Sequence, residues 1–266
     1  MEKNTEMNID LTGKHAVVCG STQGIGKCVA LELANLGASV TLVARNEEKL
    51  QGVLKELKPN NQHGYLVADF TKPTQLEQKI KDWASKNTAH ILLNNTGGPK
   101  GGPIRDAKVS EFQSAFTQHL ICNHIMVQAL YPGMKEAGYG RIVNIISTSV
   151  KQPLDGLGVS NTVRGAVANW SKTMANELGQ FNITVNNVLP GATDTVRLQS
   201  IAENKAAQST GLNYDEIIKN MAAQSPMKRI AQPEEIANAV AFLASPAASY
   251  INGINVPVDG GRTKSL

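Results

Sequence analysis

The sequence predicts an α/β fold, in which a doubly wound parallel sheet of seven strands has helices on both faces. Three observations lead to this prediction. Short apolar runs rich in β-branched residues alternate along the chain with segments of helix length. The runs are continuously apolar, as expected of strands that are buried on both faces. No internal repeat or change in composition divides the chain, so residues 1–266 are expected to form one domain.

Seven apolar runs give the expected strands. They are HAVVCG (15–20), ASVTLVA (38–44), HGYLVAD (63–69), AHILLNN (89–95), GRIVNIIS (140–147), ITVNNVLP (183–190) and INGINVPVDG (251–260). Helix-length segments separate them, and in the first of these Val29, Leu33 and Leu36 recur at helical spacing. Helical crossovers of this kind connect parallel strands, because the chain must return to the starting edge before each new strand.

One segment breaks this alternation. Residues 192–225 form a long, polar and partly helical insertion between the sixth strand and the last helix. Long insertions in compact domains are often binding loops or lids. We therefore expect a substrate lid at about residues 192–225. Its mixture of apolar and charged side chains does not define the substrate.

The composition is typical of a globular protein in a reducing compartment. The 266 residues are 41% hydrophobic and 18% charged, which suits a chain that buries a large core. Cys19, Cys28 and Cys122 are odd in number, lack CxxC spacing and lie in apolar stretches. The N-terminal residues lack the apolar core of a signal peptide, and no apolar run is long enough to cross a membrane. We expect a cytoplasmic protein without membrane contact.

The charge pattern bears on the class of partner. The net charge of +4 is small and evenly spread, and basic and aromatic residues do not interleave. Nucleic acid is therefore not an expected partner, and no metal site is expected. A small-molecule ligand fits the pattern better.

The turn after the first strand reads GSTQGIG, residues 20–26. Gly20, Gly24 and Gly26 lie at the turn and at the start of the following helix. Glycines let the backbone approach a pyrophosphate, and a helix N-terminus offers free N–H groups and a positive dipole end. A glycine triplet alone also suits a tight strand-to-helix turn, but this one opens an alternating α/β chain. The sequence therefore predicts a Rossmann-type dinucleotide-binding domain.

The end of the second strand bears on the choice of cofactor. A site for NAD places an acidic residue here to hydrogen-bond the adenosine ribose, whereas this chain has Arg45 followed by Asn46. A guanidinium suits the 2′-phosphate of NADP, which an acidic side chain would repel. We expect NADP(H) to be favoured over NAD(H). The alternative is a solvated arginine that caps a loop.

Further motifs extend over nearly the whole chain. They are VADF with Asp69, NNTG (94–97), GRIVNIIS ending at Ser147, PG (190–191) with Thr195, and INGINVPVDGG near the C-terminus. Together with GSTQGIG, they make the chain resemble the short-chain dehydrogenase/reductase family, and within it the 3-oxoacyl-carrier-protein reductase type. The resemblance implies that Asp69 contacts the adenine, that Asn94 and Gly97 shape the cofactor wall, and that residues 190–195 lie along the nicotinamide.

The expected cofactor-binding residues come from six segments of the chain. They are Gly20, Ser21, Thr22, Gln23, Gly24, Ile25, Gly26, Arg45, Asp69, Phe70, Asn95, Thr96, Gly97, Arg164, Pro190, Gly191, Thr193 and Thr195. The resemblance also implies a homotetramer, built partly from helices at 110–137 and 160–179 and from the C-terminal strand.

The catalytic positions depart from the family pattern. Members normally use a serine to orient the carbonyl, a tyrosine to transfer the proton, a lysine to lower the tyrosine pKa and hold the nicotinamide ribose, and an asparagine to support a water relay. Ser147 matches the serine. Ser160 stands where the tyrosine is expected, and Arg164 stands where the lysine is expected. His119 occupies the asparagine position, judged by its spacing to later residues of the same helix.

These substitutions change the proton chemistry. An aliphatic hydroxyl is a far weaker acid than a phenol, so Ser160 alone is a poor general acid. Arg164 stays protonated and stabilises anions without sharing protons. One candidate proton source is His119, although a histidine on a long helix is more often a packed residue; His124, Lys151 and Tyr214 are weaker candidates. Alternatively, Ser147 and Ser160 bind the oxygen while Arg164 clamps a carboxylate or phosphate.

Three functions therefore fit the sequence. The favoured one is an NADP-dependent oxidoreductase that acts on a carbonyl or secondary alcohol by an altered proton relay. The second is a lyase or isomerase that uses Ser147, Ser160 and Arg164 to stabilise an enolate-like charge. The third is a catalytically silent nucleotide-binding protein. The expected substrate is a small carbonyl or acyl compound, with an anionic one suited to Arg164 and to Lys100 in the glycine-rich segment 95–103.

Overall fold

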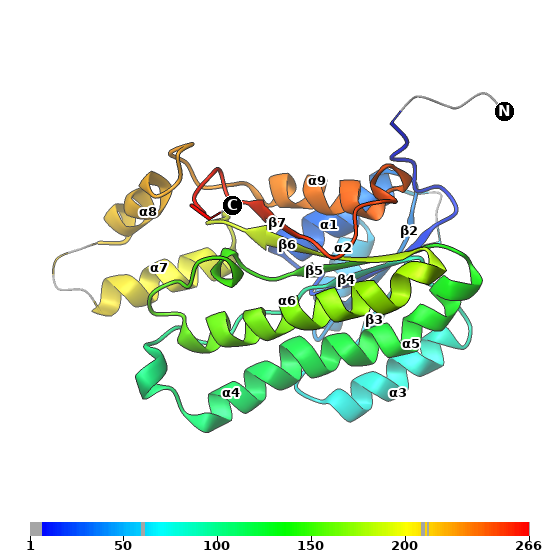
Figure 1. The fold of residues 1–266 in the computed structure, drawn as a ribbon, viewed down its shortest axis with the longest axis horizontal. Helices are drawn as coiled ribbons and strands as arrows, with labels where there is room; N and C mark the ends of the chain where they lie inside the picture. Colours follow the sequence, from blue (N-terminus) through cyan, green and yellow to red (C-terminus); the bar gives the residue numbers. More distant parts are fainter. Residues whose placement is uncertain (1–6, 60–61, 209–210, 212, 266) are drawn as a thin grey trace.

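The structure is a computed structural model that describes residues 7–59, 62–208, 211 and 213–265. Seven strands form a parallel sheet in the order β3-β2-β1-β4-β5-β6-β7 (Figure 1). The first strand, β1 (His15–Cys19), pairs with both β2 and β4, so the winding of the sheet reverses there. This arrangement confirms the predicted doubly wound sheet.

The strands fall within the seven predicted runs. They are β2 (Ser39–Ala44), β3 (Gly64–Val67), β4 (Ile91–Asn94), β5 (Gly140–Ile145), β6 (Ile183–Pro190) and β7 (Asn255–Val258). The last one is much shorter than the predicted run 251–260. Gly253, with φ of 71°, and Gly260, with φ of 61°, lie on either side of it and turn the backbone out of the extended conformation.

Helices α1 (Gly24–Asn35), α2 (Glu47–Leu54) and α9 (Pro233–Ala244) cover one face of the sheet (Figure 1). Helices α3 (Pro73–Ala84), α5 (Cys122–Glu136) and α6 (Gly158–Leu178) cover the other face. Val18 packs into the first core and its neighbour Val17 into the second, because successive strand residues point to opposite faces. Both faces are therefore apolar, as the uninterrupted runs predicted.

Helix α4 (Val109–Phe116) leads into α5 through a π-helical turn, Thr117–Ile121. Ala115 of α4 packs against Val159 and Val163 of α6. This contact supports the first half of α6, where Ser160 and Arg164 are found.

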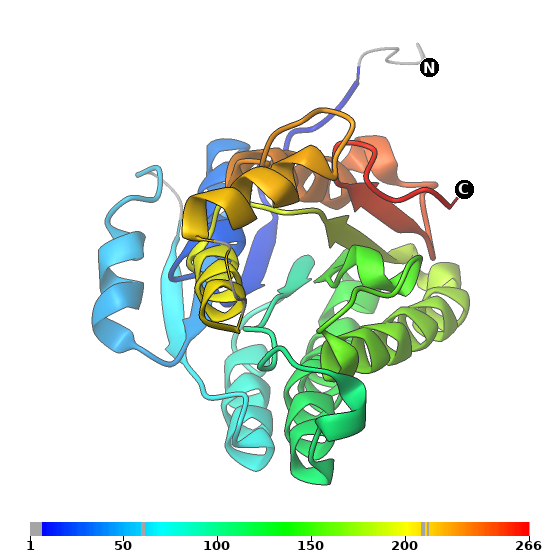
Figure 2. The same ribbon diagram turned by 90° about the vertical axis from the view of Figure 1, so that its left-hand side faces the viewer.

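The insertion after β6 contains two helices, α7 (Val196–Gln208) and α8 (Tyr214–Ala223), which pack against each other. Figure 2 shows them in front of the rest of the fold, at one end of the sheet. Residues 209, 210 and 212 of the predicted lid lie outside the described residues. No helix in the part of the chain that the structure describes is long and apolar enough to span a membrane.

Candidate functional site

A cavity of about 690 Å³ runs along the carboxyl ends of the parallel strands. Each of five strands contributes a residue at or just after its end: Gly20, Ala44, Asn95, Ser147 and Pro190. Ligands of open α/β sheets bind at this edge, where the winding reverses. The cavity is therefore the natural candidate site.

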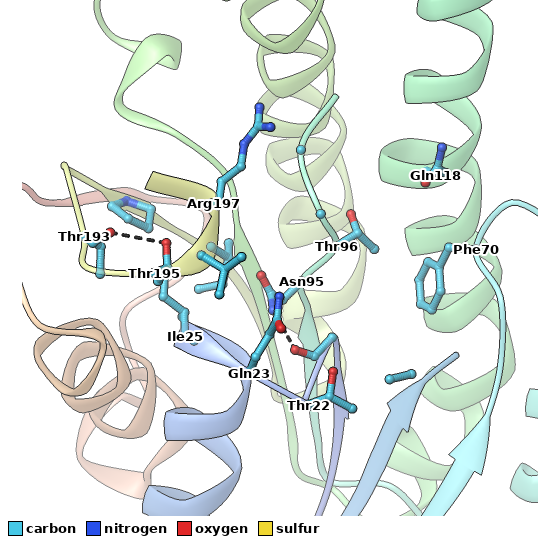
Figure 3. Close-up of a pocket in the computed structure, with 18 of the residues that line it drawn as sticks. Thr22, Gln23, Ile25, Phe70, Asn95, Thr96, Gln118, Thr193, Thr195 and Arg197 are labelled. Atoms are coloured by element: carbon cyan, nitrogen blue, oxygen red, sulfur yellow. Dashed lines mark hydrogen bonds between the residues drawn. The ribbon is translucent and has the colours of Figure 1, made fainter. Parts of the chain in front are cut away.

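The turn between β1 and α1 forms the floor of this cavity. Gly20 has φ of 63°, and a Cβ atom there would lie 2.6 Å from the carbonyl oxygen of Asn95. Asn95 Nδ2 donates to the carbonyl oxygens of Cys19 and Gly20, at 3.3 and 3.4 Å, which ties the turn to the end of β4 (Figure 3). The packing therefore excludes a side chain at Gly20 and lets the backbone itself line the cavity.

The N-terminus of α1 meets the same floor. Its N-cap residue, Gln23, makes no side-chain capping bond, and both Gln23 and Gly24 line the cavity. The first N–H groups of a helix have no intrahelical partner, and the dipole adds a partial positive charge. This end suits a pyrophosphate, as the glycine pattern predicted.

One end of the cavity lies beyond β2 and β3 and carries exposed cations. Arg45 and Lys49 line it together with Asp69 and Phe70. Burial raises the pKa of Asp69, but hydrogen bonds with Thr71 and the charges of Arg45 and Lys72 outweigh burial and lower it below its usual value. Lys49 was not predicted from the sequence, although it follows Arg45 by four residues at the start of α2.

The opposite end holds three of the predicted catalytic residues. Ser147 follows the end of β5 by two residues, and its Oγ accepts a hydrogen bond from the N–H of Ser149 at 3.1 Å. Ser160 and Arg164 lie one turn apart on α6, so their side chains share a face. All three line the cavity, and their catalytic roles stay a prediction.

Arg164 is buried, with 8% of its surface exposed. Its Nη1 donates to the carbonyl oxygen of Ile145 at 2.9 Å. Burial, with repulsion from the nearby Arg197, lowers the pKa of Arg164 to about 10. The group remains a cation at neutral pH and stabilises an anion placed beside it.

His119 lies in the π-helical turn, behind the cavity wall, and is 2% exposed. Its Nδ1 is 2.5 Å from Oγ1 of Thr96, which does line the cavity. Burial first, and then the charges of Arg164 and Arg197, lower the pKa of His119 to about 2. The imidazole is therefore neutral at pH 7, and the catalytic role of His119 stays a prediction.

The structure leaves a few predicted residues outside the cavity lining. Ser21 is fully buried, and its Oγ has no hydrogen-bond partner within the described part of the chain. Gly26 packs α1 closely against the turn after β1, since a Cβ atom there would lie 2.1 Å from the carbonyl oxygen of Gly20. Asn94 donates to Asn144 at 2.8 Å inside the sheet. The other predicted cofactor residues line the cavity: Gly20, Thr22, Gln23, Gly24, Ile25, Arg45, Asp69, Phe70, Asn95, Thr96, Gly97, Arg164, Pro190, Gly191, Thr193 and Thr195.

Comparison with known proteins agrees with this geometry. The family described as Enoyl-(Acyl carrier protein) reductase matches residues 20–263, from the glycine turn to the C-terminal segment. The 3-oxoacyl-(acyl-carrier-protein) reductase FabG of Pseudomonas aeruginosa is 31% identical over 261 residues, which cover 97% of this chain and 100% of that protein. The chain belongs to the short-chain dehydrogenase/reductase family.

Two further members of the short-chain dehydrogenase/reductase family are similar over their full lengths. The NADPH-dependent reductase BacG of Bacillus subtilis is 29% identical, with 96% of this chain and 100% of that protein covered. The crystal structure of L-sorbose reductase from Gluconobacter frateurii, complexed with NADPH and L-sorbose, is 31% identical. It superposes with a TM-score of 0.89, with 98% of this chain and 100% of that chain covered.

The cavity is also lined by residues that were not predicted as site residues from the sequence. Five of them come from the π-helical turn, the segment before α6 and the start of α7: Gln118, Leu157, Val196, Leu198 and Ile201. A sixth, Arg197, points along the segment that follows Thr96 (Figure 3). These residues lie in or beside expected functional segments, but their contact with the cavity depends on how the π-helical turn, the segment before α6 and α7 pack in the folded chain.

Proposed function

We propose that this chain is an NADPH-dependent reductase of the short-chain dehydrogenase/reductase family, acting on a small carbonyl compound through a proton relay without tyrosine and lysine. The observation that carries the proposal is the cavity itself. It joins the uncapped start of α1, the cations Arg45 and Lys49, and the trio Ser147, Ser160 and Arg164. Two relatives described as NADPH-dependent or bound to NADPH support the cofactor assignment.

The residues at the exposed end fit NADPH better than NADH. Arg45 and Lys49 offer two cations to a 2′-phosphate, and Asp69 is placed for the adenine. Glycines at the turn leave room for the pyrophosphate at the start of α1. When bound, NADPH supplies a hydride to the carbonyl carbon.

The chain's own residues then act on the carbonyl oxygen. Ser147 and Ser160 donate hydrogen bonds to it, and the guanidinium of Arg164 stabilises the negative charge that develops. The oxygen takes its proton from solvent, so one NADPH and one proton are consumed for each alcohol formed. Arg164 thus replaces acid catalysis by charge stabilisation.

His119 fits a positioning role in this scheme. A neutral imidazole has no excess proton to give at pH 7, but it fixes the hydroxyl of Thr96 at the cavity wall. The lid assignment rests on the start of α7, because Arg197, Leu198 and Ile201 line the cavity from residues 192–225. We also expect a cytoplasmic homotetramer, and light scattering after gel filtration measures the number of subunits.

The test of this function is a titration of the purified chain with NADPH and NADH, followed by addition of ketones, ketoacids and acyl thioesters. We expect NADPH to bind more tightly than NADH, and at least one carbonyl compound to oxidise it in equal amounts. Conversion of a compound without oxidation of NADPH would instead indicate a lyase or isomerase. Binding without any turnover would indicate a silent nucleotide-binding protein, and no binding would overturn the cofactor assignment.

A further inference from the structure

We infer that Arg164 and Arg197 together bind an oxyanion of the substrate, so that the carbonyl compound carries a carboxylate or a phosphate group. This inference deepens the proposed function and rests on it for the position of the carbonyl. It assigns to Arg197 a role in substrate selection.

The two arginines reach the same end of the cavity from different elements. Arg164 comes from α6, and Arg197 comes from the first turn of α7. Burial lowers the pKa of both Arg164 and His119; the charge of Arg197 lowers both further, and the charge of Arg164 also lowers that of His119. Two cations and a neutral imidazole are thus gathered around one space.

Neither arginine has an acidic partner within the part of the chain that the structure describes. The ion pairs in the described part of the chain involve other residues. Of the described residues that line the cavity, only Asp69 is acidic, and it lies at the far end. Burying like charges without a counter-charge is costly. An anion from the substrate removes that cost, because it pairs with both guanidinium groups at once.

The hydrogen bonds leave donors free on both arginines. Arg164 donates one N–H to the carbonyl oxygen of Ile145, and Arg197 donates one to the carbonyl oxygen of Pro99 at 2.5 Å. Each guanidinium has five N–H donors in a fixed plane, so the other donors remain for a ligand. Carboxylates and phosphates match such forks with paired hydrogen bonds.

The glycine-rich segment 95–103 shapes the place of Arg197. A Cβ atom at Gly98 would lie 3.3 Å from its Nη2, so a side chain there would push the guanidinium. The bond to Pro99 fixes the arginine against this segment. Lys100 of the same segment is exposed and does not line the cavity, so the structure favours Arg197 as the second cation.

The anion in question is distinct from the phosphates of the cofactor. Arg45 and Lys49, which we assign to the 2′-phosphate, line the other end of the cavity. We assign the pyrophosphate to the start of α1. Arg164 lies one turn from Ser160, which we place at the carbonyl oxygen. The oxyanion therefore belongs to the molecule that is reduced.

The test compares binding of charged and neutral ketones to the NADP⁺-saturated protein by calorimetry. The pairs are acetoacetate, levulinate and 2-oxoglutarate against their methyl esters, and dihydroxyacetone phosphate against dihydroxyacetone. We expect at least one anion to bind about tenfold or more tightly than its neutral partner, from charge-assisted hydrogen bonds. The pair that shows this preference tells whether a carboxylate or a phosphate is bound.

The variant R197M tests whether Arg197 binds the substrate anion or only maintains the shape of the cavity. We expect it to weaken binding of the preferred anion about 30-fold, with less than about threefold change for the neutral partner and for NADPH. R197K should restore part of the preference, and R105M, at a side chain 84% exposed outside the cavity lining, serves as the control. Equal losses for anion and neutral partner would reduce Arg197 to a structural role.

Other outcomes also overturn the inference. No preference for an anion in any pair rules out the oxyanion site, and a loss of NADPH affinity in R197M assigns Arg197 to the cofactor. Turnover reports separately on the proposed function. An anion that binds through Arg197 but is never reduced would leave the site in place and remove the reductase.

Discussion

The two ends of the cavity carry the same charge in opposite settings. Arg45 and Lys49 are exposed, whereas Arg164 is buried and Arg197 is half-buried. Exposed cations stay hydrated and are screened by salt, so they cost little when no ligand is present. At the buried end, desolvation and repulsion from Arg197 lower the pKa of Arg164 to about 10.

This difference teaches how one cavity serves two ligands. The cations at the exposed end remain hydrated when no phosphate is bound, so they hardly lower the free energy of unfolding. At the buried end, desolvation and repulsion oppose folding until an anion enters. We therefore expect the two ends to respond differently to substitution, pH and salt.

The largest expected effect is that of Arg164→Met at the buried end. We expect kcat/KM to fall by about 100- to 1000-fold, since the charge that stabilises the developing oxyanion is lost. The melting temperature should not fall in parallel, because an apolar replacement of an unpaired buried charge is often neutral or stabilising. Steady-state kinetics and thermal unfolding measure the two quantities. Retained activity, or an activity loss explained by unfolding, contradicts the prediction; Arg164→Lys is the matched control.

At the exposed end, Arg45→Glu should change the choice of cofactor. We expect the Kd for NADPH to rise about 30-fold, because a cation beside the 2′-phosphate is replaced by an anion, while the Kd for NADH changes less than about threefold. Fluorescence titration of both cofactors gives these constants. Lys55→Glu, exposed at the end of the same α2 and outside the cavity lining, is the control. Equal weakening of both cofactors would remove the role of Arg45.

The burial of His119 should make the free energy of unfolding fall at acidic pH. Its pKa is about 2 in the folded chain but about 6.5 when unfolded, so the unfolded chain takes up the proton first. This contribution to stability is present above pH 6.5 and is lost as the pH falls. We expect His119→Asn to remove about 2 kcal/mol of the destabilisation between about pH 8 and pH 5. Urea unfolding at both values measures this, and an unchanged pH dependence would contradict the burial of His119.

Salt should produce the smallest effect and separate the two ends. Raising the ionic strength from about 0.05 to about 0.5 M is expected to weaken NADPH binding only a few-fold, through screening of Arg45 and Lys49. The preference for an anionic ketone at Arg164 and Arg197 should change less. Calorimetry at both salt concentrations compares them. A stronger salt dependence at the buried end would show that solvent reaches it freely.

The fold was largely predictable because strands that are buried on both faces have continuously apolar sequences. The runs around Val17 and Val143 are apolar whichever face each residue meets, and the turn GSTQGIG marks the first crossover. Strand ends were less predictable, since Gly253 breaks β7 by its backbone conformation. The family resemblance singled out Ser147, Ser160 and Arg164; all three line the cavity, and their catalytic roles stay a prediction.

Arg197 and the setting of His119 required the folded chain. Arg197 was one charge among several in a polar insertion, and its inward position is shown by its bond to Pro99 and its place in the cavity lining. His119 was assigned from helical spacing, but its burial comes from packing around the π-helical turn. Both depend on contacts between segments far apart in sequence, which no local pattern encodes.

The π-helical turn Thr117–Ile121 also sets a limit on how this chain can vary in length. A π turn holds one residue more than an α turn, and each helical residue rotates the side chains by about 100°. Deleting one residue here would turn the face of α4 and carry Ala115 away from Val159 and Val163. Those two valines flank Ser160 on α6. A deletion of a single codon, far upstream of Ser160 and Arg164, is thus expected to misalign them without touching either one.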